Sequence, residues 1–130
     1  MSEEKVPSEL RYTKSHEWVK VADVATVGIT DHAQAALTDI VFVDLPAAGK
    51  TVTKGGSVLV LESVKTVADV YAPGNGSVTE SNAELKSHPE LVNQDPYGKG
   101  WLYRIELGGP IPAGELLSAD EYRALVASGK

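Results

Sequence analysis

The chain contains no cysteine, which excludes disulfide bonds, thiolate metal sites and cysteine nucleophiles. No apolar run approaches the roughly 20 residues that a membrane-spanning helix requires. The first ten residues, MSEEKVPSEL, are polar and acidic. They have neither the apolar stretch of a secretory signal nor the arginine-rich composition of a transit peptide. These absences predict a cytoplasmic protein with no membrane segment.

Basic residues are fewer than acidic ones: 12 Lys and Arg against 18 Asp and Glu give a formal net charge of −6. Nucleic-acid phosphates would be repelled, so no nucleic-acid partner is expected. A length of 130 residues with 42% hydrophobic residues suits one soluble domain with a modest core. We predict a flexible polar arm over residues 1–9 and a single domain over residues 10–130.

Short strand-like runs separated by turn residues dominate the sequence. The run at 40–45 is β-branched and aromatic, and we expect it to form a buried strand. Several short strands with turns between them predict a mainly β fold, either a sandwich or a flattened barrel. The expected strands lie at 16–21, 24–30, 40–45, 58–62, 66–71, 77–80 and 100–107, and residues 51–57 are expected to form a short strand and a turn.

Helical patterns are few. Thr30 can cap a short helix over residues 31–37. Ser118, followed by Glu121, fits a capping box that opens a final helix over about 118–127. Residues 81–100 are rich in Asn, Pro and Gly, which predicts a long loop with one helical turn near 83–88.

A lysine interrupts the apolar stretch LVLESVKTVADV at 59–70. Residues 63–66 can form a four-residue turn that places Val64 and Lys65 at its tip. A valine is unfavourable in a solvated turn, so the exposed pair of Val64 and Lys65 suggests a surface that another protein recognises. A catalytic lysine usually needs burial to lower its pKa, which a hairpin tip does not provide. The tip suits a lysine that another enzyme reaches and acylates, whereas the simpler alternative is an ordinary solvated lysine.

Six blocks, in order from about residue 11 to residue 125, resemble the H-protein family of the glycine cleavage system. The Asn-x-Asp-Pro-Tyr-x-x-Gly-Trp motif is the most specific of them, and Glu-Ser-Val-Lys surrounds the tip lysine. The blocks are YTKSHEWV (12–19), VGITDHAQ (27–34), DIVFVDLP (39–46), ESVKTVADVYAPGNGSV (62–78), NQDPYGKGWL (93–102) and LLSADEY (116–122).

The resemblance implies that Lys65 carries an amide-linked lipoate. It implies a lipoyl/biotinyl-domain-like flattened barrel of two antiparallel sheets with short helices and a C-terminal helix. It also implies a monomeric, non-catalytic shuttle. Such a carrier takes an aminomethyl group from glycine decarboxylase, the P protein, to the tetrahydrofolate-dependent aminomethyltransferase, the T protein. It presents its dithiol to dihydrolipoamide dehydrogenase, the L protein, and receives lipoate from lipoylating enzymes.

Supporting residues follow from the same resemblance. Glu62, Gly49 and Gly76 match features that lipoylating enzymes read, although a strand-end charge and turn geometry would also account for them. Ser15, Glu17 and Asp69 match positions near the loaded arm, and without the resemblance the two acids are surface acids. A protonated amine in a partly dry cleft needs acceptors and opposite charge, so we expect that cleft to be acidic.

Other conspicuous residues receive structural interpretations. We expect Trp18, Phe42, Trp101 and Tyr103 to pack in the core or at its rim. The three histidines, His16, His32 and His88, show no metal-ligand spacing, so no metal site is expected. Thr38 stands where the family usually has glycine, and Thr66 where it commonly has alanine or serine; the first can alter a turn.

Three rival interpretations remain. A biotin carrier normally flanks its lysine with methionine, whereas the only methionine here is Met1. A lipoyl domain of a 2-oxo acid dehydrogenase is usually joined to Pro/Ala-rich linkers and a catalytic domain, which this chain lacks. An H-like protein that relays lipoyl groups to other enzymes would share all of these motifs.

Overall fold

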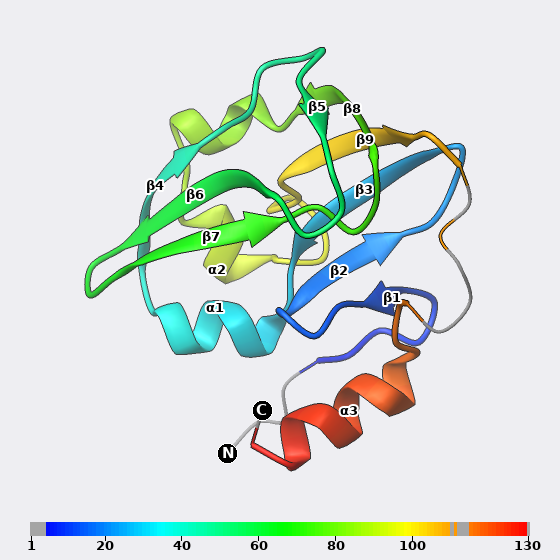
Figure 1. The fold of residues 1–130 in the computed structure, drawn as a ribbon. Helices are drawn as coiled ribbons and strands as arrows, with labels where there is room; N and C mark the ends of the chain where they lie inside the picture. The colour runs from blue at the N-terminus through cyan, green and yellow to red at the C-terminus, as the bar shows by residue number, and fades with distance from the viewer. Residues whose placement is uncertain (1–4, 110, 112–114, 130) are drawn as a thin grey trace.

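A computed structural model describes residues 5–109, 111 and 115–129, which form two antiparallel sheets (Figure 1). The six-stranded sheet has the order β1 (Arg11–Tyr12), β2 (Glu17–Lys20), β3 (Val24–Ile29), β9 (Tyr103–Leu107), β8 (Gly76–Ser81), β5 (Thr51–Val52). The three-stranded sheet has the order β4 (Ile40–Asp44), β6 (Ser57–Ser63), β7 (Val67–Tyr71). The mainly β fold predicted from the sequence is therefore confirmed.

The two principal helices form where their caps predict. Helix α1 (Asp31–Leu37) begins after Thr30, whose Oγ1 accepts the N–H of Ala33 at 3.1 Å. Helix α3 (Ala119–Ala127) begins after Ser118, and both hydrogen bonds of the predicted capping box are present. In both cases the signal is a contact between residues three apart.

The structure departs from prediction in three places. Strand β1 was not expected. The expected loop at 81–100 contains the predicted helical turn as η1 (Ala83–Lys86) and also a second short helix, α2 (Leu91–Gln94), that was not expected. The expectation that all of 40–45 is buried is wrong, because Val41 and Phe42 are 54% and 51% exposed. The pairing of β4 with β6 has an irregularity between residues 40 and 42, and a bulge of this kind turns the following side chains outward.

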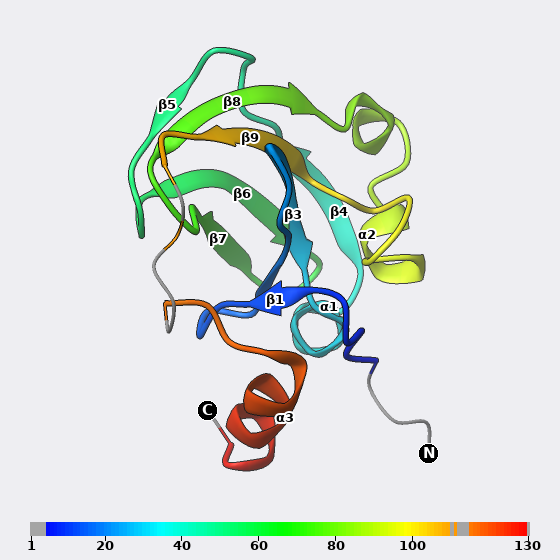
Figure 2. The ribbon, with the colours of Figure 1, turned by 90° about the vertical axis from the view of Figure 1, so that its right-hand side faces the viewer.

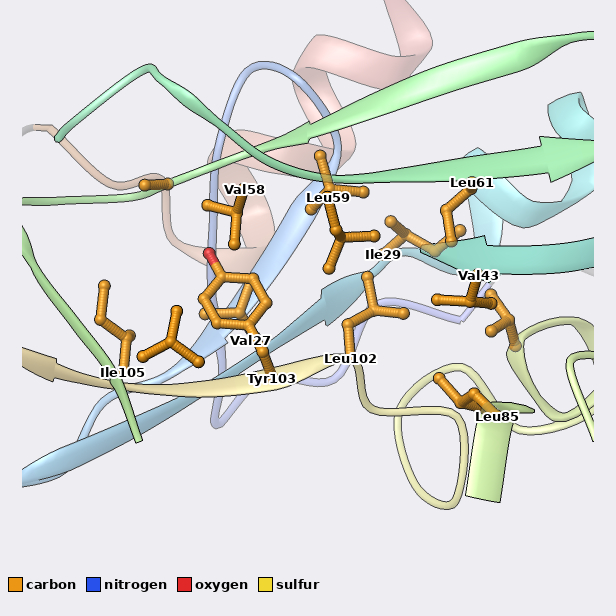
Figure 3. Close-up of a cluster of buried hydrophobic side chains, with 14 of the residues drawn as sticks. Val27, Ile29, Val43, Val58, Leu59, Leu61, Leu85, Leu102, Tyr103 and Ile105 are labelled. Atoms are coloured by element: carbon orange, nitrogen blue, oxygen red, sulfur yellow. The ribbon is translucent and has the colours of Figure 1, made fainter. Parts of the chain in front are cut away.

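The main core lies between the two sheets. Figure 3 shows its branched side chains around Tyr103, which extends from β9 towards Val58. Tyr103 is 0% exposed, and its hydroxyl has no hydrogen-bond partner among the described residues. Burial first, and then the Glu17 carboxylate, raises the pKa of Tyr103 above its ordinary value.

A second, smaller core joins α3 to the edge of the six-stranded sheet. In Figure 2 this helix lies beneath β1, away from the hairpin of β6 and β7. The segment before α3 pairs with β1, because Tyr12 and Leu117 exchange two backbone hydrogen bonds of 2.8 and 2.7 Å. The second core contains Leu10, Tyr12, Trp18, Ala119 and Tyr122.

The first residues described also contact this region. Lys5 N–H donates to Asp31 at 2.9 Å, and the Val6 carbonyl accepts from Arg123 at 2.8 Å. The rest of the predicted arm, residues 1–4, lies outside the described residues, and its flexibility stays a prediction.

Candidate functional site

Lys65 lies at the tip of the β6–β7 hairpin, in the four-residue turn that the sequence predicts. Ser63 N–H donates to the Thr66 carbonyl at 2.8 Å, and Ser63 Oγ accepts the N–H groups of Lys65 and Thr66. Val64 N–H donates to the Asp39 carbonyl at 3.0 Å, which ties the tip to the segment after α1. The turn is thus braced on two sides, while the Lys65 side chain is exposed.

Exposed apolar side chains surround this tip. Val64 and Val67 are 66% and 61% exposed, and Phe42, expected in the core or at its rim, is half exposed. The register places Phe42 opposite Glu62 and Glu62 opposite Val67, so these three side chains form a row across one face of the sheet. Clustered apolar surface of this kind is typical of a protein contact.

The predicted recognition residues are not brought together. Glu62 is exposed beside the tip, whereas Gly76 begins β8 in the other sheet, away from the tip in Figure 1. Gly49 has a φ of 91°, and its N–H donates to the Val78 carbonyl of β8 at 2.7 Å. A Cβ on Gly76 would lie 2.3 Å from the carbonyl oxygen of Glu106. Backbone geometry alone therefore requires glycine at both positions.

Glu17 is a buried carboxylate, 2% exposed, that connects the two sheets. Its Oε1 accepts hydrogen bonds from the hydroxyls of Thr13 at 2.5 Å and Ser15 at 2.6 Å. Its Oε2 accepts the backbone N–H of Tyr71 in β7 at 3.2 Å. Sequence reasoning missed Thr13 and Tyr71. The alternation Thr-x-Ser-x-Glu marks the first, whereas a backbone donor leaves no sequence signal.

A cleft of about 650 Å³ opens beside Glu17. It is lined by residues 13–15, 54–55, 71–73 and 115–117 as well as Glu17. The sequence predicts an acidic cleft, but the lining is of mixed charge, because Lys14 and Lys54 also line it. Lys54 forms an ion pair with Glu115, so that lysine is largely neutralised within the wall.

Asp69 does not line this cleft but lies on β7 between the Lys65 tip and the cleft. Its Oδ1 accepts a hydrogen bond from Ser57 Oγ at 2.8 Å. Side chains two apart on a strand share a face, so Val67, Asp69 and Tyr71 form one row along β7. At about 3.3 Å per residue the row spans roughly 13 Å, from beside Lys65 to the cleft wall.

Two of the three histidines lie within hydrogen-bond distance of other side chains. Within the described part of the chain, no group of three or more His, Asp or Glu side chains could hold a metal ion. His16 Nδ1 lies 2.6 Å from the hydroxyl of Tyr122, and His88 Nδ1 lies 3.1 Å from Glu90. No helix among the described residues is long and apolar enough to cross a membrane.

Two antiparallel sheets with an exposed lysine on a braced hairpin tip define a lipoyl-domain-like fold. Comparisons with known proteins identify the family. The glycine cleavage H-protein family model matches residues 10–129, and the chain belongs to this family.

Individual relatives agree with this assignment. A glycine cleavage system H protein of Psychrobacter sp. is 54% identical over 121 residues, covering 92% of this chain and 96% of the relative. One from Staphylococcus haemolyticus is 49% identical over 122 residues, covering 93% and 97%. The crystal structure of a glycine cleavage system H protein from Mycobacterium marinum has a TM-score of 0.87 and 41% identity, covering 94% of this chain and 99% of that one. The family predicted from the sequence is thus confirmed.

Proposed function

We propose that this chain is the lipoyl-bearing, non-catalytic shuttle of the glycine cleavage system and acts in the cytoplasm. It carries an aminomethyl group from glycine decarboxylase to the aminomethyltransferase and presents its dithiol to dihydrolipoamide dehydrogenase. The observation that carries the proposal is the exposed Lys65 on a braced tip in a chain of the H-protein family.

The residues present fit a lipoyl group. Lys65 offers an exposed amine for acylation, and its turn is braced by Ser63 and by the Asp39 carbonyl, so the attachment point is well defined. When bound there, the group would supply a disulfide that is reduced as it accepts cargo and is later reoxidised. Acylation removes the positive charge of Lys65. Three acidic residues then remain nearby: Asp39 and Glu62 beside the tip and Asp69 along β7.

Glu62 and its neighbours are proposed as the surface that lipoylating enzymes and the three partner enzymes contact. The exposed row of Phe42, Glu62 and Val67 supports this, because it combines apolar area with one charge beside the acylated lysine. Gly49 and Gly76 would contribute indirectly, by holding β5 against β8.

Glu17, Ser15 and Asp69 are proposed to hold the charged cargo between transfers. A carboxylate has about four acceptor positions, and Glu17 already uses three of them for Thr13, Ser15 and Tyr71. One position remains for a cationic N–H that enters from the cleft. Asp69 lies along the row that leads there, so it can stabilise the same charge on its way.

Reconstitution tests the proposed function directly. Lipoylated wild-type protein should support glycine–bicarbonate exchange with purified glycine decarboxylase, and peptide mapping should place lipoate on Lys65. Lys65→Arg keeps the charge but offers no primary amine, so it should fold normally and support no exchange. Exchange by Lys65→Arg, or lipoate on Lys54 or Lys86 in the wild type, would contradict the proposal. A lipoylated protein that supports no exchange would instead favour an H-like relay for other enzymes.

A further inference from the structure

The turn that carries Ser15 and Glu17 contains an unusual backbone conformation. His16, between them, has a φ of 70°, in the left-handed region that non-glycine residues seldom occupy. Thr13 closes the turn, because its N–H donates to the Glu17 carbonyl at 2.9 Å and its Oγ1 accepts the Glu17 N–H at 3.1 Å. Such a conformation persists only where the surroundings hold it in place.

The surroundings that hold His16 belong to the C-terminal helix and to the start of α1. His16 Nδ1 lies 2.6 Å from the Tyr122 hydroxyl, which lies 2.7 Å from Thr30 Oγ1. The Thr30 N–H donates to the His16 carbonyl at 3.1 Å and closes a ring of three residues. His16 is thereby held through both its side chain and its backbone.

Tyr122 is itself well fixed. It is 0% exposed, its ring stacks on Tyr12 with centroids 4.8 Å apart, and it lies in the first turn of the capped helix α3. The segment just before α3, residues 115–117, lines the same cleft from the other side. The C-terminal part of the chain thus touches the cleft twice, once as its wall and once through His16.

We propose that Tyr122 is a positioning residue of the cargo cleft. Through His16 it holds the strained turn, so that the Ser15 hydroxyl and the Glu17 carboxylate stay in place at the cleft. Helix α3 would thereby contribute to cargo retention. The proposal rests on the proposed function, because it assigns the cleft to the carried group. Lipoylation at Lys65 does not depend on it, since the hairpin tip is braced by other residues.

Two tyrosines of the second core provide a matched pair of variants. Tyr122→Phe removes the hydroxyl that contacts His16. Tyr12→Phe removes the hydroxyl of the ring that stacks on Tyr122. The Tyr12 hydroxyl donates to the Pro7 carbonyl at 2.5 Å and does not contact the turn. Both changes remove one oxygen from the same cluster, so a purely structural effect would be similar in the two proteins.

The first measurement is amide hydrogen exchange on unmodified protein. Tyr122→Phe should speed exchange at the Thr13 and Glu17 amides by about fivefold to tenfold, a factor typical of one lost hydrogen bond. Amides of β3 should not change, since faster exchange there would report lower global stability. Tyr12→Phe should leave Thr13 and Glu17 unchanged.

The second measurement is release of ammonia from purified, cargo-loaded protein without partner enzymes. Tyr122→Phe should release it several-fold faster than wild type, with an unchanged rate of lipoylation at Lys65. Equal behaviour of the Tyr122→Phe and Tyr12→Phe proteins in both measurements overturns the positioning role. If Tyr122→Phe does not fold, His16→Asn replaces it, because asparagine tolerates the positive φ but is too short to reach Tyr122.

The two proposals fail differently. If wild-type protein loses its cargo as fast as free aminomethylated lipoamide does, the cleft does not protect cargo, and the positioning role in retention falls with the proposed function. If wild type retains cargo and Tyr122→Phe retains it equally well, only the role of Tyr122 is refuted.

Discussion

Replacing Glu17 by glutamine separates the structural role of this side chain from the cargo-holding role proposed for it. The buried carboxylate accepts three hydrogen bonds and joins β2 to β7. A carboxamide keeps one acceptor oxygen and gains an NH₂ donor. The Thr13 and Ser15 hydroxyls can rotate to accept from that donor, whereas the Tyr71 N–H requires the oxygen.

The magnitude of the stability loss follows from this arrangement. Hydrogen bonds to a charged acceptor contribute about 1.5–3 kcal/mol each and neutral ones about 0.5–1.5 kcal/mol, and no partner need be left unpaired. The three bonds together would lose about 3 kcal/mol by these values, but the neutral side chain also avoids the cost of burying a charge, so we expect Glu17→Gln to lower the free energy of unfolding by about 1–2 kcal/mol. For a domain of this size that lowers the melting temperature by several degrees, which calorimetry can detect.

Cargo retention should respond more strongly. An ammonium in the cleft loses its charged acceptor, which is worth about 1.5–3 kcal/mol, or roughly a tenfold to hundredfold shift towards the exposed arm. Ammonia release from loaded protein should accelerate by up to that factor, while lipoylation of Lys65 stays nearly unchanged. Glu80→Gln is the matched control, because Glu80 is an exposed acid paired with Arg104. If Glu17→Gln and wild type release ammonia at the same rate, Glu17 serves the fold alone.

Three further predictions concern other parts of the chain. Phe42→Thr should leave the free energy of unfolding within about 0.5 kcal/mol of wild type but weaken partner binding, measured as a raised KM for the carrier with each partner enzyme; an unchanged KM would contradict the docking role. Thr38 has φ 64° and ψ −152°, a region that essentially only glycine occupies, so Thr38→Gly should raise the free energy of unfolding by about 1 kcal/mol in denaturant titration, and a loss of stability would show that the strain is absent. Tyr103→Phe removes a buried hydroxyl with no partner among the described residues and should raise the melting temperature by a few degrees. Because the pKa of Tyr103 is raised in the folded protein, its phenol ionises first in the unfolded chain, so the free energy of unfolding does not depend on this ionisation below about pH 10 and falls as the pH rises above it. The free energy of unfolding, measured from pH 9 to 12, should therefore fall less steeply in Tyr103→Phe than in wild type, by up to about 1.4 kcal/mol per pH unit.

The features most easily predicted from the sequence are those in which a side chain contacts the backbone a few residues away. Thr30 and Ser118 cap their helices, and Ser63 closes the turn under Lys65. Each contact spans three residues or fewer and depends little on the rest of the fold. The position of the lysine, both helix starts and the mainly β class were therefore predictable from sequence.

Features that depend on register were not predictable. Phe42 faces outward because the pairing of β4 with β6 shifts at the start of β4. Gly76 has no room for a side chain because β9 brings the Glu106 carbonyl against it. An alternating apolar pattern indicates a strand but not which residue of another strand lies opposite, and one slipped residue reverses every side chain.

The sequence by itself determined the family, the lysine at a hairpin tip and the acid at position 17. Only the tertiary structure decided that this acid is buried, that it joins the two sheets, and that the C-terminal helix reaches its turn through Tyr122 and His16, 106 residues apart. The physical reason is distance along the chain. Local hydrogen bonds form within a few residues, whereas a contact between distant residues exists only once both sheets and the second core have set the positions of both partners.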